Sequence, residues 1–374
     1  MAMAIYKNEL VKRQFYGHLK NAKGFSLKTI DCFEKAIWLW EDFTGKADFA
    51  NFNKTKAEEF KEWLKGKKKV RSEGEVSLSF CYDNLRHLKT FFEWLSKQSG
   101  YKSKINQTVI DYLNLTMGEI RTATQPRNGE CPALEDIKSV IEHITGKSEV
   151  EMRDKALISL TFLTGARIAA ISSLSMQCFD RKNLTIHQDP TWGVRTKNSK
   201  NITTAIVPFS YKEPLNYFLE WFDYLEKDKK FQPTDPIFPA TKRENGADNL
   251  SYYSSGKVEP TFWKNTTSPR KIFEKRFVQA GIKYYHPHTF RHLLVEEISK
   301  LPLTEEQKKA FSQNLGHENT GTTFGSYGYG KIREEKQIEI IRNINFEGQQ
   351  REVKYLASEE EMERIIQKAI NHKQ

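Results

Sequence analysis

The chain has 374 residues, of which 38% are hydrophobic, and 59 basic against 48 acidic residues give it a net charge of +11. This length and apolar content suit two or three domains with substantial cores. The four cysteines lie far apart without a C-x-x-C pair, which argues against zinc and disulfides and fits a reducing cytosol. Because no apolar run approaches a membrane span and no signal peptide pattern is present, we expect no membrane partner and a cytoplasmic location. The positive excess suits DNA, although composition alone favours a soluble basic protein equally.

The first third of the chain has the periodicity of several helices. Ser26 can cap a helix with apolar residues at helical spacing, namely Ile30, Phe33, Ile37 and Trp40. Thr55 and Glu58 have the spacing of a capping box, and Gly66 can end the helix that they begin. A longer helix follows, and residues 109–115 predict a fourth.

A basic loop interrupts this helical segment, and its cations are Lys67, Lys68, Lys69 and Arg71. Such a charge run is ordinarily only solvated, but in a DNA-binding protein it is a candidate phosphate contact. Residues 122–132 (TATQPRNGECP) lack apolar periodicity and contain two prolines and a glycine, so we predict an interdomain linker there. The predicted domains are therefore residues 1–121 and 133–345.

The second domain opens with two predicted helices, at residues 134–144 and 153–163. Gly165 breaks the second helix, because glycine adopts the left-handed conformation in which helices often end. Arg167 follows directly and stands at the start of a further predicted helix over residues 168–174.

Three short strands are predicted from alternation and β-branched content, at residues 184–187, 192–196 and 203–208. The polar stretch 227–266 is predicted to be mostly loop. Helices then return: one starts at Ser268-Pro269, one runs from Thr289, and Thr304 and Gln307 form the capping box of the next. The chain is therefore predicted to be mainly α and multidomain, with a small antiparallel sheet in its second domain.

The second domain also carries the residue types needed for attack on a phosphodiester. In chain order these candidates are Arg167, Lys200, His288, Arg291, His317 and Tyr327. His288 and Arg291 form a His-x-x-Arg step, His317 follows a glycine, and Tyr327 lies ten residues after His317. Two guanidinium groups, two imidazoles, a lysine and a phenol together suit attack by tyrosine on phosphorus.

This order of residues, with its Gly-His step and its Ser-Tyr-Gly surroundings, resembles the catalytic signature of the tyrosine recombinases, the phage integrase family. The resemblance covers the catalytic domain well and the first domain only in outline. It implies a helical, SAM-like core-binding domain and an α+β catalytic domain that close around a DNA duplex. It also implies that neither metal nor another cofactor takes part.

The two arginines are the expected phosphate clamp. Charge builds up on the non-bridging oxygens during transfer, and the planar guanidinium forks of Arg167 and Arg291 can each give two parallel charge-assisted hydrogen bonds. An isolated arginine at a helix start is usually a surface ion-pair partner, so the assignment depends on the whole motif. Ala170 departs from the family, in which many members carry an acidic residue at this position.

The imidazoles have separate expected roles. A neutral His288 can accept the tyrosine proton, as its counterpart does in the family, whereas His286 and His292 are rivals only by proximity. His317 would donate a hydrogen bond to the scissile phosphate. A lone histidine is more often a core or capping residue. For His317, the spacing to Arg291 and to the tyrosine favours a functional role.

Two assignments leave an alternative open. Tyr327 is the expected nucleophile because of its distance from His317, and Tyr329, two residues later, is the alternative. In the family, a hairpin lysine protonates the leaving 5′ oxygen. Lys200 fits that role through its distance to the Val-Pro step at Pro208, and Lys197 is the alternative.

The sequence therefore predicts a site-specific tyrosine recombinase, the integrase of a mobile genetic element, acting on DNA in the bacterial cytoplasm. The expected partners are double-stranded DNA at specific recombination sites, three further copies in a homotetramer, and an accessory DNA-bending factor. Residues 346–374 form a tail with an amphipathic helix, which we expect to be exchanged between protomers. The alternatives are a type IB topoisomerase-like enzyme and a sequence-specific DNA-binding protein without catalytic activity.

Overall fold

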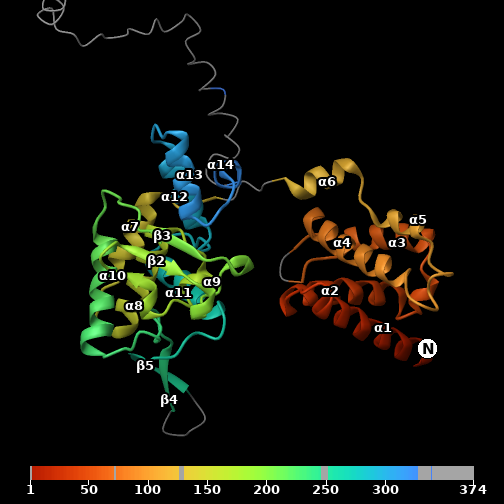
Figure 1. The fold of residues 1–374 in the computed structure, drawn as a ribbon, viewed down its shortest axis with the longest axis horizontal. Helices are drawn as coiled ribbons and strands as arrows, with labels where there is room; N and C mark the ends of the chain where they lie inside the picture. Colours follow the sequence, from red (N-terminus) through yellow and green to blue (C-terminus); the bar gives the residue numbers. More distant parts are fainter. Residues whose placement is uncertain (1, 71–72, 126–129, 246–251, 327–337, 339–374) are drawn as a thin grey trace, which may run out of the picture. The chain divides into compact units, whose positions relative to one another are not determined.

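The computed structural model describes every residue except 1, 71–72, 126–129, 246–251, 327–337 and 339–374. The chain divides into two compact units, Met1–Arg127 (unit 1) and Asn128–Gln374 (unit 2) (Figure 1). The secondary structure of the described residues is mostly helical with two small antiparallel sheets, which confirms the predicted fold class.

Unit 1 is built from helices around an aromatic core. Its α-helices are α1 (Ala2–Asn21), α2 (Leu27–Thr44), α3 (Lys54–Lys65), α4 (Leu78–Leu95), α5 (Gln107–Ile110) and α6 (Met117–Thr124). Trp40 of α2 lies at the centre, with its ring centroid 5.1 Å from that of Phe60 and 5.2 Å from that of Phe92. The aromatic side chains of these helices are therefore mostly core residues of this unit.

The structure confirms some predicted helix ends in unit 1 and corrects others. Ser26 caps α2 as predicted. The Thr55–Glu58 capping box is wrong, because the side chain of Asn53 accepts a hydrogen bond from the Lys56 amide and starts α3 earlier. The single helix over residues 109–115 is also wrong: α5 gives way to a 3₁₀ turn, η2 (Asp111–Leu113), and α6 then runs into the segment predicted as linker.

Unit 2 is organised around α8. Its α-helices are α7 (Leu134–His143), α8 (Glu149–Thr164), α9 (Ile168–Ile171), α10 (Glu213–Asp223), α11 (Thr267–Gln279), α12 (Thr289–Ser299), α13 (Glu305–Asn314) and α14 (Thr320–Ser326). Helix α8 is buried around its circumference and packs against α7, α9, α10 and α12 (Figure 1). The predicted helix starts near Ser268 and Thr289 are confirmed, as is the capping box of Thr304 and Gln307.

A three-stranded antiparallel sheet lies beside these helices, in the order β1 (Phe179–Asp180), β2 (Thr185–Gln188), β3 (Ile202–Ala205). The strands predicted near 184–187 and 203–208 are confirmed, but the strand at 192–196 is wrong. Asp189 caps a 3₁₀ turn, η4 (Pro190–Trp192), by accepting a hydrogen bond from the Thr191 amide, and the chain bends away from the sheet there. Strand β1 takes the third place instead.

The stretch predicted as loop, residues 227–266, contains a second sheet. Strands β4 (Thr241–Asn245) and β5 (Tyr252–Val258) pair antiparallel. Their sequence is too polar to reveal a strand by alternation, and the pairing itself uses backbone groups. At the end of β5 the Val258 amide donates to Glu149 of α8 over 2.7 Å, which anchors this hairpin to the unit.

Candidate active site

The turn between α8 and α9 places Arg167. Gly165 ends α8 with φ of +57°, and a Cβ atom there would lie 3.0 Å from Leu294 Cδ2 and 3.2 Å from Leu315 Cδ2. Glycine therefore satisfies both the left-handed backbone and the close packing of α12 and of the residue after α13. The chain leaves this turn with Arg167 as the N-cap of α9, half-buried and without an ion-pair or hydrogen-bond partner among the described residues.

Arg291 connects this turn to the end of α13. Its side chain is only 2% exposed. Instead the guanidinium donates to the carbonyl oxygens of Gly165, over 3.2 Å, and Leu315. Its Nη2 also lies 2.9 Å from Nε2 of His317. Two carbonyl oxygens and an imidazole thus fix the position of the guanidinium.

His317 is fixed through its backbone and through both ring nitrogens. Gly316 before it has φ of +72° and lies so close to β3 that a Cβ atom would be 2.5 Å from Ile202 Cδ1. The His317 amide donates to the Ser312 carbonyl over 3.0 Å, and the ring Nδ1 lies 2.8 Å from Thr323 Oγ1. The side chain is buried, at 7% exposure.

The protein environment keeps both candidate imidazoles neutral. Burial and the nearby charges of Arg291 and Arg167 lower the pKa of His317 to about 4. Crowding by protein atoms, and then the charges of His292, Arg291 and Arg167, lower the pKa of His288 to about 4, although its side chain remains exposed at the surface. A histidine with such a pKa is uncharged at neutral pH, so it can accept a proton.

The segment between β2 and β3 brings two lysines to the same place. The 3₁₀ turn η5 (Lys197–Ser199) has positive φ angles at Asn198 (60°) and Ser199 (50°), a strained backbone of the kind found at functional sites. Lys197 is exposed and has no partner among the described residues, and its charge contributes to the lowered pKa of His317. Lys200 forms an ion pair with Glu318.

These side chains line one cavity of about 240 Å³. The residues that line it are Arg167, Lys197, Asn198, Lys200, Ile202, Gly316, His317, Glu318, Asn319 and Thr322. Arg291 contacts this group through His317, and His288 lies within the electrostatic influence of both arginines. We call Arg167, Lys197, Lys200, His288, Arg291 and His317 the active-site cluster.

The β2–β3 hairpin is held against α13 by a contact that the sequence did not reveal. The side-chain amide of Asn314 pairs with Ala205, accepting from its N–H over 2.6 Å and donating to its carbonyl over 3.1 Å. The Thr204 hydroxyl also donates to the Asn314 carbonyl over 2.9 Å. Since α13 leads directly to His317, this contact sets the position of the hairpin lysines relative to the histidine.

The remaining predicted residues belong to unit 1, lie beside His288 or lie outside the described residues. Tyr327, Tyr329 and Arg71 lie outside the described residues. Of the basic loop in unit 1, Lys67 pairs with Asp42 over 3.2 Å, and Lys68 and Lys69 are exposed. The rivals of His288 have roles beside it: Nδ1 of His286 accepts from the His288 amide, and the His292 ring centroid lies 5.7 Å from that of His288.

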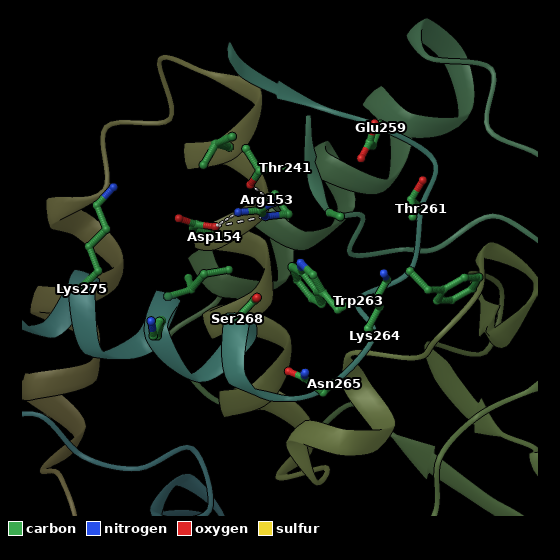
Figure 2. A pocket seen from close by; sticks show the side chains of 15 residues that line it. Arg153, Asp154, Thr241, Glu259, Thr261, Trp263, Lys264, Asn265, Ser268 and Lys275 are labelled. Carbon is green, nitrogen blue, oxygen red and sulfur yellow. Dashed lines mark hydrogen bonds and ion pairs between the residues drawn. The ribbon is translucent and has the colours of Figure 1, made fainter. Parts of the chain in front are cut away.

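A larger cavity of about 1010 Å³ lies elsewhere in unit 2 and contains none of the active-site cluster (Figure 2). Arg153 and Arg276 both bind Asp154 there, one on each carboxylate oxygen, each with a contact of 2.7 Å. Figure 2 shows Arg153 between Asp154 and Thr241, to which it also donates over 2.8 Å. We call Arg153, Asp154 and Arg276 the buried ion network, and its mutual pairing indicates a structural role.

The described residues contain neither a metal-binding cluster nor a membrane-spanning helix. No group of three or more histidine, cysteine, aspartate or glutamate side chains there could hold a metal ion. Within the same residues, no helix combines the length and apolar character needed to cross a bilayer.

Comparison with known proteins agrees with this geometry. Residues 133–329 match the phage integrase family. Over 322 residues the chain is 20% identical to tyrosine recombinase XerC of Lactobacillus delbrueckii subsp. bulgaricus, covering 84% of this chain and 92% of the relative. Among solved structures, a lambda integrase dimer bound to a COC′ core site superposes with a TM-score of 0.56 at 10% identity, covering 86% of this chain and 96% of that chain. The Tn1549 transposon integrase in complex with transposon right end DNA gives a TM-score of 0.54 at 14% identity, covering 89% and 98%.

Unit 2 is helical with a small antiparallel sheet, and it gathers two arginines, two neutral histidines and hairpin lysines. This is the arrangement of a tyrosine recombinase. The chain belongs to the phage integrase family of site-specific recombinases, as the sequence resemblance predicted.

Proposed function

We propose that this recombinase cuts DNA with Tyr327 and rejoins it to a partner strand, and that residues 133–345 carry this reaction. The tyrosine oxygen bonds to the scissile phosphorus while the bond from phosphorus to the 5′ oxygen breaks. A 3′-phosphotyrosyl link and a free 5′ hydroxyl result. The 5′ hydroxyl of a partner strand then attacks this phosphotyrosyl link and releases the tyrosine. The energy of the broken phosphodiester bond is therefore retained in the link and used to form the new one. Two such exchanges pass through a Holliday junction and integrate or excise DNA.

The observation that carries this proposal is the excess of positive charge around the small cavity. Arg167 and Arg291 would bind the non-bridging oxygens of the scissile phosphate, and His317 would donate a hydrogen bond to it. His288 would accept the tyrosine proton, which its lowered pKa supports because the ring is neutral at neutral pH. The phenol has an ordinary pKa of about 10, so it needs this base and the nearby cations.

Lys200 is our candidate for the acid that protonates the leaving 5′ oxygen. Its contact with Glu318 means that it must leave this carboxylate before it can reach the DNA. Lys197 is the second candidate, because it lines the same cavity and no described residue pairs with it. The two lysines are separated by the turn at Asn198 and Ser199, which both have positive φ angles.

The DNA substrate and the assembly extend beyond this site. We propose that unit 1 binds the duplex, with phosphate contacts from the basic loop of Lys67, Lys68, Lys69 and Arg71. Four copies on two specific sites would carry out the exchange, with the tail of residues 346–374 linking neighbouring protomers. An accessory DNA-bending factor and a cytoplasmic, bacterial setting complete the proposal. The DNA part of this proposal is supported by the related integrase structures, which are complexes with transposon right end DNA and with a COC′ core site.

The test is covalent trapping on nicked duplexes made from the sequence junctions that flank the gene. The wild-type chain should form a denaturant-resistant adduct, Tyr327→Phe should bind the duplex without forming it, and Tyr329→Phe should form it normally. An adduct formed by Tyr327→Phe would overturn the nucleophile assignment. Relaxation of supercoiled plasmid that lacks these junctions would instead identify a topoisomerase.

A further inference from the structure

A chain of hydroxyl groups runs behind His317, away from the cavity. Thr323 of α14 and Ser312 of α13 are both fully buried, at 0% exposure. Thr323 Oγ1 lies 2.8 Å from His317 Nδ1 and 2.8 Å from Ser312 Oγ. Ser312 Oγ in turn donates to the carbonyl of Asn319 over 3.3 Å. The imidazole is therefore connected on one side to Arg291 and on the other to two hydroxyls and a carbonyl.

The direction of each hydrogen bond follows from one fact about arginine, which can only donate. Arg291 donates to Nε2 of His317 over 2.9 Å, so Nε2 carries no proton in the neutral ring. The proton is then on Nδ1, which donates to Thr323 Oγ1. Thr323 donates to Ser312 Oγ, and Ser312 donates to the Asn319 carbonyl, which ends the chain on an acceptor.

We propose that Thr323, supported by Ser312, is a positioning residue that sets the ring orientation and the tautomer of His317. This inference rests on the proposed function, because it assumes that His317 serves the scissile phosphate. It assigns to α14 a second task besides leading towards Tyr327. Thr323 does not touch the cavity and acts only through the histidine.

A hydroxyl suits this position better than a carboxylate, because it can both accept and donate. When the guanidinium of Arg291 binds a phosphate oxygen instead of His317, Nε2 of His317 must carry a proton in order to donate to that phosphate. Nδ1 then becomes an acceptor, and Thr323 can turn its hydroxyl towards it while Ser312 donates to Thr323. The same two side chains thus support both tautomers. A carboxylate would accept only and would favour the charged imidazolium, against the lowered pKa of this ring.

The first test compares cleavage by full-length variants. Thr323→Val keeps the shape of the side chain and removes the hydroxyl, so we expect adduct formation to slow by about tenfold or more, the effect of losing one buried hydrogen bond. Binding of the uncut duplex should not change. Thr323→Ser should restore most of the rate, and Ser312→Ala should show a smaller loss because Thr323 still contacts the imidazole.

Thr161→Val is the matched control. Thr161 is also fully buried, and its hydroxyl donates over 2.7 Å to Leu157 within α8, away from His317. We expect the two valine variants to melt at similar temperatures while only Thr323→Val cuts slowly. If Thr323→Val cuts as fast as the Thr161→Val control, or if Thr323→Ser is as slow as Thr323→Val, the proposal is overturned.

The second test reads the tautomer directly and needs no DNA. In the full chain labelled with ¹⁵N-histidine, with His317 assigned by its loss in His317→Asn, Nδ1 should have the shift of a protonated nitrogen and Nε2 that of an unprotonated one. The opposite pattern in the wild-type chain would overturn the proposal even if Thr323→Val cuts slowly or does not fold. If the wild-type chain forms no adduct but shows the expected tautomer, the proposed function fails while the hydrogen-bond chain stands.

Discussion

The two polar clusters of unit 2 handle positive charge in opposite ways. In the buried ion network, Arg153 and Arg276 share Asp154, and all three side chains are nearly inaccessible to water. In the active-site cluster, Arg291 is equally buried but is held by carbonyl oxygens and an imidazole. The only carboxylate lining the active-site cavity, among the described residues, is that of Glu318, and it faces Lys200 at the exposed rim.

This difference in the partners of the arginines distinguishes a cluster that stabilises the fold from one that can bind an anionic ligand. A buried arginine that meets a carboxylate is already neutralised, and an incoming phosphate would have to displace that partner. Arg167 of the active-site cluster has no ion-pair partner among the described residues, so it keeps its affinity for an anion. Ala170, three residues after Arg167, is buried at 1% exposure and adds no negative charge beside it.

The largest expected effect concerns the proton donor of the active-site cluster. Lys200→Ala should slow cleavage by up to about 10⁴-fold, the upper range for loss of a general acid. A substrate with a sulfur in place of the bridging 5′ oxygen should restore the rate, because a thiolate leaves without a proton. Single-turnover cleavage of both substrates measures this. Rescue of Lys197→Ala, with Lys200→Ala unaffected by the sulfur, would transfer the role to Lys197.

The second prediction tests the comparison itself with one substitution in each cluster. Arg167→Ala should slow cleavage by about 10²–10³-fold, as for loss of one transition-state donor, while the free energy of unfolding stays the same or rises. Asp154→Asn should lower the free energy of unfolding by about 3–5 kcal/mol, because it leaves two arginines buried without their partner. Denaturant titration and single-turnover cleavage would show both. A marked loss of stability in Arg167→Ala would mean that its charge is compensated after all.

The third prediction concerns pH and uses the lowered pKa values of His288 and His317. In the unfolded chain a histidine binds its proton near pH 6.5, whereas in the folded chain these two do so only near pH 4. Between these values the unfolded state binds more protons, so the free energy of unfolding is highest above pH 6.5 and falls as the pH drops towards 4. His286 and His292, with pKa values lowered chiefly by burial, add to the slope.

Denaturant titrations at pH 7 and pH 5 would measure this loss of stability. His317→Asn should flatten the slope, because asparagine does not titrate. An equal slope in this variant would show that the cationic surroundings of His317 do not govern its protonation.

The smallest expected effect lies at the rim of the cavity. Glu318→Gln removes the carboxylate that faces Lys200, so duplex affinity should rise, by less than about tenfold, at low salt. Glu318 is 84% exposed, and surface ion pairs contribute little and are screened, so the difference should vanish at high salt. Titration of binding at two salt concentrations is sufficient. A loss of affinity would mean that Glu318 positions the lysine for DNA instead of competing with it.

The sequence predicted residues that the structure brings together, because the chemistry requires particular residue types in a particular order: Arg167, Lys200 and His317 line one cavity and Arg291 contacts His317. Their catalytic roles stay a prediction. It did not predict Thr323, Ser312 or Asn314, since nothing about a threonine or an asparagine in the sequence tells which partner it meets in the fold. The wrong strand at residues 192–196 has a similar cause: Trp192, Val194 and Thr196 alternate as in a strand, but the Asp189-Pro190 turn overrides the pattern. The hairpin of β4 and β5 was missed because its pairing is a property of the backbone.

The contact between Asn314 and Ala205 has a further consequence for the sheet. Strand β3 lies at the edge of the order β1-β2-β3, and exposed edges can pair with strands of other chains. The amide of Asn314 occupies both outward backbone groups of Ala205 and so closes this part of the edge, like one residue of a further strand. Exchange of the Ala205 amide hydrogen is therefore a local reporter of α13 docking, and any motion that carries α13 away from the hairpin would uncover an edge prone to self-association.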